Sequence, residues 1–255
     1  MVKKRLIFTL LYQDGYFFLS RNFRLQRVGD INWLNKNYNF SHIATAIDEL
    51  IVLDVSRDIH NTQKFCEDIQ QVTKGCFVPL ALGGGIDSTE QVDLMMNSGA
   101  DKIIINTALT KNPELVRKLI SQYGSQCVIA SVDYRQNDGE FHAFIDRGQE
   151  QLTTPFSQYL RYLTELNVGE IYLNSIEQDG TGQGYCLNVL EHTEHISKTP
   201  LIIAGGAGNA HHLLEGITQP NVDAAATANL FNFIGDGLPL ARKHLIDNGI
   251  ELAQW

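Results

Sequence analysis

The sequence has 255 residues, of which 44% are hydrophobic, and a formal net charge of −9. This composition fits one globular domain with a substantial core. The acidic balance argues against general nucleic-acid binding, and no apolar stretch reaches the roughly 20 residues that span a membrane. The four cysteines form no Cys-x-x-Cys pair. We therefore expect a reduced, cytoplasmic protein without a disulfide framework.

The first predicted strand, residues 6–12, contains Leu11 and leads into an aromatic segment. Asp14-Gly15 is followed by alternating aromatic residues up to Phe23. An Asp-Gly pair in such a segment predicts a hairpin. This hairpin is either a lid that folds over a ligand or an ordinary hydrophobic cover.

Further along the first half, a glycine run and a polar strand end predict an anion site. Gly85 closes the run that precedes a predicted helix at 90–97, with Asp87 or Ser88 as its cap. Bare amides at a helix start bind anions. Asn106 and Thr107 end the next predicted strand, so their side chains could complete a phosphate cradle.

The second half contains an apolar run, residues 127–132, that ends at Asp133. Its length and branching predict a strand buried on both faces. A carboxylate at the downstream end of such a strand is costly to bury, which favours either a role in chemistry or tight pairing with neighbours. Helices are predicted at 112–123, 154–166 and 210–217.

The two halves repeat each other. Asp133 stands 122 residues after Leu11, and Glu170 stands 121 residues after Glu49. Four strands in each half, alternating with helices, predict a single (β/α)8 barrel over residues 1–255, with half-barrels at about 1–120 and 121–245. An open doubly wound sheet is the alternative, but no diphosphate-binding glycine fingerprint follows the first strand.

A second cluster of glycines and small residues follows strands six, seven and eight. The segments are Asp179-Gly180-Thr181-Gly182, Gly205-Gly206-Ala207-Gly208 and Ala228-Asn229, which predict a glycine-lined pocket on the opposite side of the mouth. Glycines also serve tight turns, which is the structural alternative. Two clusters at symmetric positions indicate an elongated ligand with a phosphate at each end and Asp133 near its middle.

Charged residues begin four of the predicted strands, at the opposite mouth of the barrel: Arg5, Glu49, Lys102 and Glu170. Two charges of each sign can close a neutral ring, and by itself this pattern favours a salt-bridged plug. His192 and His195 stand three apart on a predicted helix, and His211-His212 open another. None of these falls at a strand end, so we assign no metal and no cofactor.

With these residues in place, the chain resembles the cyclase subunit family of imidazole glycerol phosphate synthase over essentially its whole length. The resemblance rests on collinear sequence words: Lys4-Arg5, Asp14-Gly15, Asp48-Glu49-Leu50, Gly83-Gly84-Gly85-Ile86, Gly99-Ala100-Asp101-Lys102, Ile105-Asn106-Thr107-Ala108, Gly124-Ser125-Gln126, Gly169-Glu170-Ile171, Asp179-Gly180-Thr181 and Gly205-Gly206-Ala207-Gly208. The family is a half-barrel duplication that binds a bisphosphorylated precursor. It receives ammonia from a glutaminase subunit docked on the bottom face.

The resemblance assigns a role to each candidate residue. The ammonia gate would be formed by Arg5, Glu49, Lys102 and Glu170, with Asp101 at the glutaminase interface. One phosphate would fall to Gly85, Asn106 and Thr107, and the other to Asp179, Gly180, Gly206 and Ala228, with Asn229 in place of a serine. The resemblance thus favours the gate over the plug.

The chain departs from this family where the chemistry takes place. Of the two catalytic aspartates, only Asp133 is present, because Leu11 occupies the other position. Leu19 replaces the lysine of the lid, Tyr12 follows the lost aspartate, and Cys186 and Ala204 also differ from the family pattern. Loss of one acid or base group typically costs about 10²- to 10⁴-fold in rate.

These departures favour a divergent paralogue of the kind found in bacterial surface-polysaccharide gene sets. There, with a matching glutaminase and a separate amidotransferase, the pair supplies ammonia for acetamidino sugars of O-antigen lipopolysaccharide. One alternative is a genuine histidine-pathway cyclase. Another is a non-catalytic scaffold that activates the glutaminase.

Overall fold

A computed structural model of the chain describes residues 3–38, 43, 45–57, 60–196 and 198–253. Eight parallel strands close into a barrel, each hydrogen-bonded to the next. In spatial order they are β1 (Arg5–Gln13), β4 (Glu49–Asp54), β5 (Leu80–Gly83), β6 (Lys102–Ile105), β7 (Val128–Asn137), β10 (Glu170–Ser175), β11 (Leu201–Ala204) and β12 (Ala224–Thr227). The barrel prediction is confirmed, and the open sheet is excluded because β10 pairs with β7 as well as with β11.

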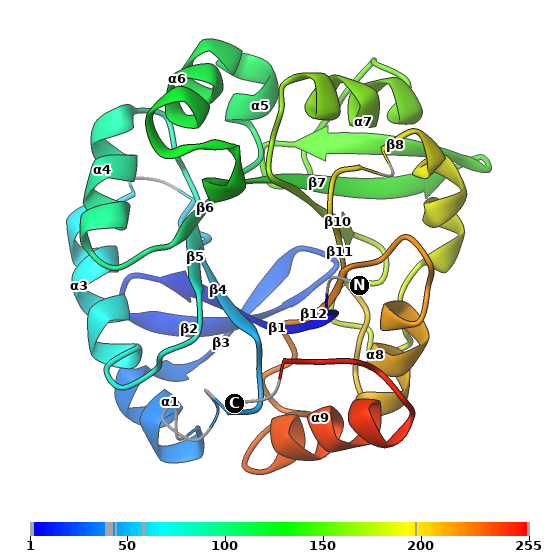
Figure 1. The fold of residues 1–255 in the computed structure, drawn as a ribbon. Coiled ribbons are helices and arrows are strands. Elements are labelled where there is room, and N and C mark those ends of the chain that lie inside the picture. The colour runs from blue at the N-terminus through cyan, green and yellow to red at the C-terminus, as the bar shows by residue number, and fades with distance from the viewer. Residues whose placement is uncertain (1–2, 39–42, 44, 58–59, 197, 254–255) are drawn as a thin grey trace.

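Helices surround the barrel (Figure 1). The α-helices are α1 (Ile31–Asn37), α3 (Thr62–Val72), α4 (Thr89–Asn97), α5 (Ala108–Lys111), α6 (Pro113–Tyr123), α7 (Phe156–Glu165), α8 (Ala210–Ile217) and α9 (Gly237–Asp247). Sequence signals set their starts. Ser88 is the N-cap of α4, and the Asn112 side chain accepts a hydrogen bond from the Leu115 N–H at the start of α6, 3.2 Å away. Such caps satisfy amides that have no partner inside the helix.

Two antiparallel extensions rise from the barrel rim. β2 (Tyr16–Arg21) pairs with both β1 and β3 (Arg24–Asp30), which confirms the predicted hairpin after Asp14-Gly15. In the other half, β8 (Glu140–Ile145) pairs antiparallel with β7 and with the short β9 (Glu150–Gln151). Both extensions start at the downstream ends of opposite strands, so they flank the same mouth of the barrel.

Two local predictions were wrong. Cys127 lies in the 3-10 helix η1 (Ser125–Cys127) and not in the strand, which begins one residue later. His192 and His195 do not share one helix, because His192 ends η2 (Leu187–His192) and His195 lies in η3 (Glu194–Ile196). Between β10 and β11 the described chain forms these two 3-10 turns where an α-helix was expected. The rise and the rotation per residue of a 3-10 helix differ from those of the α-helix on which the two histidines were expected to lie.

The hydrophobic core has two layers. One lies between the barrel and the helices; the other fills the barrel interior. The interior layer consists of Ile7, Ile51, Ala81, Ile104, Ile129, Tyr172, Ile202, Ala204, Ala224 and Ala226. Side chains of successive residues alternate between these layers, which is why the strands read as continuous apolar runs.

Candidate active site

A cavity of about 910 Å³ opens at the downstream ends of the barrel strands. Its lining includes every candidate catalytic and phosphate-binding residue predicted from the sequence: Leu11, Gly85, Asn106, Thr107, Asp133, Asp179, Gly180, Gly206, Ala228 and Asn229. The fold therefore gathers into one site residues that are more than 200 positions apart. The downstream mouth is where (β/α)8 enzymes hold their active sites.

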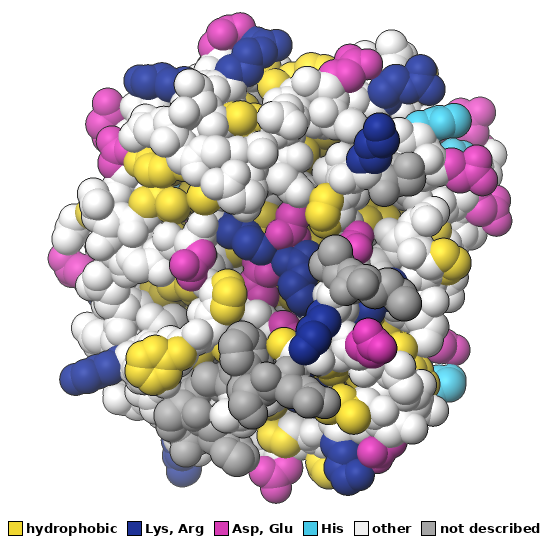
Figure 2. All heavy atoms as spheres, in the orientation of Figure 1, with side chains coloured by type: hydrophobic (Ala, Val, Ile, Leu, Met, Phe, Trp, Pro, Cys, Tyr) yellow, Lys and Arg dark blue, Asp and Glu magenta, His cyan; other side chains and the backbone are white. Residues whose placement is uncertain are grey.

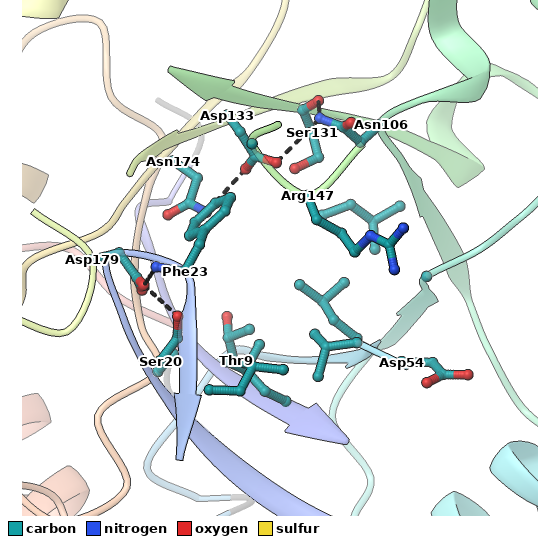
Figure 3. Close-up of a pocket in the computed structure, with 18 of the residues that line it drawn as sticks. Thr9, Ser20, Phe23, Asp54, Asn106, Ser131, Asp133, Arg147, Asn174 and Asp179 are labelled. Atoms are coloured by element: carbon teal, nitrogen blue, oxygen red, sulfur yellow. Dashed lines mark hydrogen bonds between the residues drawn. The ribbon is translucent and has the colours of Figure 1, made fainter. Parts of the chain in front are cut away.

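Asp133 sits on one wall of this cavity between two amide side chains (Figure 3). Its Oδ1 accepts a hydrogen bond from Asn174 at 3.0 Å, and its Oδ2 accepts one from Asn106 at 3.3 Å. The residue is only 8% exposed. Burial raises the pKa of the Asp133 carboxyl to about 7, although the Asn174 hydrogen bond opposes the rise. Near neutral pH this group can accept or release a proton.

The position that faces Asp133 across the cavity holds Leu11 and not a carboxylate. β1 and β7 are separated by three strands on either side of the ring, so Leu11 faces Asp133 across the mouth. Leu11 pairs in register with Leu53 of β4, and both side chains line the cavity. These two positions are therefore apolar, and no carboxylate stands directly opposite Asp133 at position 11.

In the structure, Asn106 and Thr107 are largely occupied by contacts within the protein. The Asn106 amide donates to the Ser131 carbonyl at 3.0 Å and to the Phe144 carbonyl at 3.3 Å, besides Asp133. The Thr107 hydroxyl donates to Asn106 Oδ1 at 3.3 Å and accepts from the Asp146 N–H at 3.1 Å. These contacts fix the wall beside Asp133, so an anion here would depend mainly on the neighbouring backbone.

Asp179 holds the β2–β3 hairpin against the rim of the cavity (Figure 3). Its carboxylate accepts hydrogen bonds from the Ser20 hydroxyl and from the Phe23 N–H, the latter at 3.0 Å. A Cβ at Gly180 would lie 1.8 Å from the Ser20 carbonyl oxygen, so only glycine allows this approach. The hairpin thus covers part of the mouth, as a lid would.

The second glycine corner packs backbone against backbone. A Cβ at Gly206 would lie 2.0 Å from the Gly184 carbonyl oxygen, and φ of Gly206 is +111°. Ala228 and Asn229 border this corner and line the cavity. The Asn229 side-chain oxygen accepts a hydrogen bond from the Asn232 N–H at 3.1 Å. Small residues leave the backbone within reach of a ligand on this side.

At the opposite mouth, four charged residues form a closed ring. Arg5 contacts Glu49 at 2.7 Å and Glu170 at 2.6 Å, and Lys102 contacts the same two carboxylates at 2.9 and 2.6 Å. In Figure 2, Lys, Arg, Asp and Glu side chains gather over the centre of the barrel. Burial opposes ionisation of Glu170, but the hydrogen bond and charge of Arg5 outweigh it and lower the pKa of that carboxyl.

The surface beside this ring contains Asp101. Its carboxylate accepts a hydrogen bond from the Leu80 N–H at 2.9 Å, and Asp223 does the same for Leu201 in the second half. Asp101 also lines a hollow of about 390 Å³ bordered by Phe77, whose side chain is 92% exposed. Such exposure of a large aromatic side chain is unusual and often marks a contact surface.

Sequence reasoning did not identify three groups that the structure places in the cavity lining: Asn174, the pair Asp54 and His60, and Arg147. Asp54 had a detectable signal, because it is a carboxylate at the end of a buried strand, as Asp133 is. His60 and Arg147 lie in loops, where no periodicity indicates which way a side chain points.

Within the described part of the chain, no cluster of three or more His, Cys, Asp or Glu residues could hold a metal ion. No helix in the same residues is both long and apolar enough to cross a membrane. The four cysteines are free thiols, and Cys66 is buried. The cavity lining offers carboxyl groups, amides, cationic side chains and backbone N–H groups for binding and chemistry.

Fold and site together define a (β/α)8 barrel protein with a glycine-bordered cavity at its downstream mouth and a charged ring at the other. Residues 28–235 match the family model described as histidine biosynthesis protein, and the chain belongs to this family.

Relatives match over nearly the full length. The chain is 43% identical over 256 residues to a protein of Parasynechococcus marenigrum provisionally named imidazole glycerol phosphate synthase subunit hisF2, covering 100% of this chain and 95% of that protein. It is 34% identical over 251 residues to the imidazole glycerol phosphate synthase subunits HisF of Chlorobium luteolum and Chlorobaculum tepidum, covering 98% of each chain. The expected similarity to the cyclase subunit is confirmed, and the chain is a HisF-like protein.

Proposed function

We propose that this protein receives ammonia from a partner glutaminase on the face that carries the charged ring and passes it through the barrel to a phosphorylated acceptor. The acceptor binds in the cavity beside Asp133. The product serves acetamidino-sugar synthesis for a surface polysaccharide, together with a separate amidotransferase. The protein would act in the cytoplasm without a cofactor.

The combination of an intact ring with an altered cavity carries this proposal. Each of the two ring cations contacts both ring carboxylates, with distances of 2.6 to 2.9 Å. Burying two carboxylates and two cations costs desolvation energy, and an apolar plug would seal the barrel more cheaply. A charged ring whose pairs can separate and re-form suits the regulated entry of a small polar molecule.

The layer between ring and cavity favours neutral ammonia over ammonium. It is built from isoleucines and alanines, with Tyr172 as its largest member. The Tyr172 hydroxyl lies 3.4 Å from the Thr9 hydroxyl, which leaves one polar contact near the cavity floor. An ammonium ion would lose its hydration in such a layer at a prohibitive cost, whereas neutral ammonia would not. A deprotonating step at the ring would therefore precede transfer.

At the downstream mouth, the residues of the cavity support only weak cyclase activity. The cyclase reaction of the family requires proton transfers on opposite sides of a forming ring, and the position that faces Asp133 is occupied by Leu11, which cannot supply one. The penalty for one missing acid or base is about 10²- to 10⁴-fold. We therefore expect ammonia delivery to be retained and imidazole formation to be weak.

The deciding experiment supplies the protein and its glutaminase with the bisphosphorylated histidine precursor, at saturation, with either glutamine or ammonium salt. Imidazole glycerol phosphate should form at least about a hundredfold more slowly than with an authentic synthase, because Leu11 cannot transfer a proton. Leu11→Asp should recover little, since Leu19 and Cys186 also differ from the family. Chromatographic quantification of the product gives both rates.

Two results would overturn the proposal in different ways. Turnover equal to that of the authentic enzyme would return the protein to histidine biosynthesis. If glutamine hydrolysis is stimulated but no amide nitrogen from ¹⁵N-labelled glutamine reaches the cavity or the amidotransferase product, the protein is a scaffold for the glutaminase. A histidine operon around the gene, in place of a glycan cluster, would also contradict the pathway assignment.

A further inference from the structure

A histidine–aspartate pair lies at the mouth of the cavity. Nδ1 of His60 is 2.9 Å from Oδ2 of Asp54. The other oxygen of Asp54 accepts hydrogen bonds from the Ser56 N–H at 3.0 Å and the Ser56 hydroxyl at 2.6 Å, so the carboxylate is held in place. Because a carboxylate accepts, Nδ1 carries the proton, and Nε2 is the ring nitrogen left for another partner.

The His60 ring occupies the space that a side chain at position 85 would need. A Cβ on Gly85 would lie 2.4 Å from His60 Nε2 and 2.3 Å from its Cδ2, and φ of Gly85 is +61°. Glycine is therefore required for the ring to reach this backbone. None of the described residues accepts a hydrogen bond from the Gly85 N–H. Imidazole and backbone amide thus share one corner of the cavity.

The charges around His60 favour its protonated form. The hydrogen bond to Asp54 raises the pKa of His60, while burial and the nearby Arg147 oppose the rise. The charged groups that face the ring are Asp54 from β4, Asp87 from the loop after β5, and Arg147 from the loop after β8. Arg147 also donates a hydrogen bond to the Arg57 carbonyl at 2.6 Å, which fixes its position over the cavity rim.

We infer that His60, oriented by Asp54, is a cationic ligand for a phosphoryl group bound over Gly85. This inference rests on the proposed function, because it assigns one end of the phosphorylated acceptor. It also explains how the corner binds an anion although the Asn106 amide is committed to the barrel wall. Charge-assisted hydrogen bonds from His60 and Arg147 would take the place of neutral amide contacts.

The test uses sulfate, an oxyanion that does not titrate near neutral pH. Asp133 lines the same cavity and titrates near 7, so the measurements are made on Asp133→Asn protein. With ¹³C-labelled histidine, the His60 signal is identified by its loss in His60→Gln. We expect sulfate to raise the pKa of His60 and to bind about tenfold more tightly at pH 6 than at pH 8.5, a change equivalent to about 1.4 kcal/mol.

Three variants test whether His60 and Asp54 cause the pH dependence of sulfate binding. His60→Gln should abolish the pH dependence, and Asp54→Asn should lower both the pKa of His60 and the affinity. His211→Gln, which removes a histidine that is 69% exposed on α8, should change nothing. Inorganic phosphate and ribose 5-phosphate should each displace sulfate, and the tighter of the two identifies a free or an esterified phosphate as the ligand.

If none of the three anions changes the pKa of His60, the inference is overturned. The glutaminase complex is assayed on the same preparations. If the complex forms but anions do not affect His60, only this inference fails. If anions act on His60 but no complex forms, the inference stands and the proposed function fails.

Discussion

At the scale of single residues, the environment of Asp133 couples chemistry to stability. Its carboxyl is buried with two amide donors, and none of the described residues forms an ion pair with it, so the charged form costs free energy in the folded state. Burial places its pKa near 7, compared with an ordinary value of 3.8. Groups with such raised pKa values cluster at functional sites. The free-energy cost of burying them is offset by favourable contacts elsewhere in the fold.

Asp133→Asn should therefore stabilise the protein at high pH. A raised pKa means that the folded state holds the proton more tightly, so the wild-type protein loses stability as the pH rises from about 4 to about 7. The variant avoids this loss and should gain about 1–3 kcal/mol at pH 8.5, or roughly 2–10 °C in Tm, with little gain at pH 4.5. Thermal unfolding across this pH range measures the difference.

Asp138→Asn is the matched control, because Asp138 lies in the exposed β7–β8 turn. Any effect of this control should be the same at every pH. A gain for Asp133→Asn that does not grow with pH would show that the Asp133 carboxyl is ionised without penalty in the folded protein.

At the scale of elements, a buried ion pair ties the last helix, α9, to the barrel. Arg242 donates to both oxygens of Asp48 at 3.0 Å, and the Leu6 N–H donates to the same carboxylate at 2.7 Å. Arg242 is 7% exposed and Asp48 5%. The pair therefore ties the last helix to the start of β1 and to the residue that precedes β4.

Arg242→Met should destabilise the protein by about 3–5 kcal/mol, since it leaves the Asp48 carboxylate buried without its cation. Urea unfolding gives the change in the free energy of unfolding. The neighbouring Lys243→Met removes an exposed pair with Asp247 and should cost less than about 0.5 kcal/mol. Equal losses in the two variants would mean that α9 docks by apolar contacts alone. Adding Asp48→Asn to Arg242→Met should restore part of the loss.

At the scale of the whole molecule, the two mouths of the barrel present different groups. One bears the charged ring, Asp101 and the exposed Phe77; the other bears the cavity. The length of the strands separates the two mouths, so a substitution at one mouth can leave the other intact. This separation allows residues such as Leu11 to vary at one mouth without altering the ion pairs of the ring at the other.

Co-expression with the glutaminase of the neighbouring gene should give a stable 1:1 complex at micromolar concentrations. Phe77→Ser should weaken it by about tenfold or more, as truncation of an aromatic anchor at an interface does. Leu240→Ser is the control, because Leu240 is 63% exposed on the outer helix α9. Analytical ultracentrifugation and titration calorimetry measure the complex.

Lys102→Ala in the same complex should uncouple the two reactions. Glutamine hydrolysis should continue while ammonia escapes to solvent, because Glu49 and Glu170 lose one of their two cations and the ring opens. Absence of any complex would remove the main support for the ammonia route.

Local pattern was enough for the fold and for most of the candidate site. The apolar runs, the helix caps at Ser88 and Asn112 and the offset near 122 residues predicted the barrel, because strand and helix periods are properties of short segments. The same offsets indicated which strand ends carry Asp133, Gly85 and Gly206, and a closed barrel places all downstream ends at one mouth. The family resemblance supplied their possible roles.

Only the tertiary structure decided which side chains meet. It turned the Asn106 amide into the barrel wall, set Asp179 to hold the β2–β3 hairpin, and placed the His60 ring over Gly85. These contacts join loops that are far apart in sequence, and a loop side chain takes its direction from what packs around it. The sequence by itself determined the scaffold and placed Leu11 where the family resemblance expects a carboxylate. The packing of the loops determined which side chains line the cavity and which partners they contact.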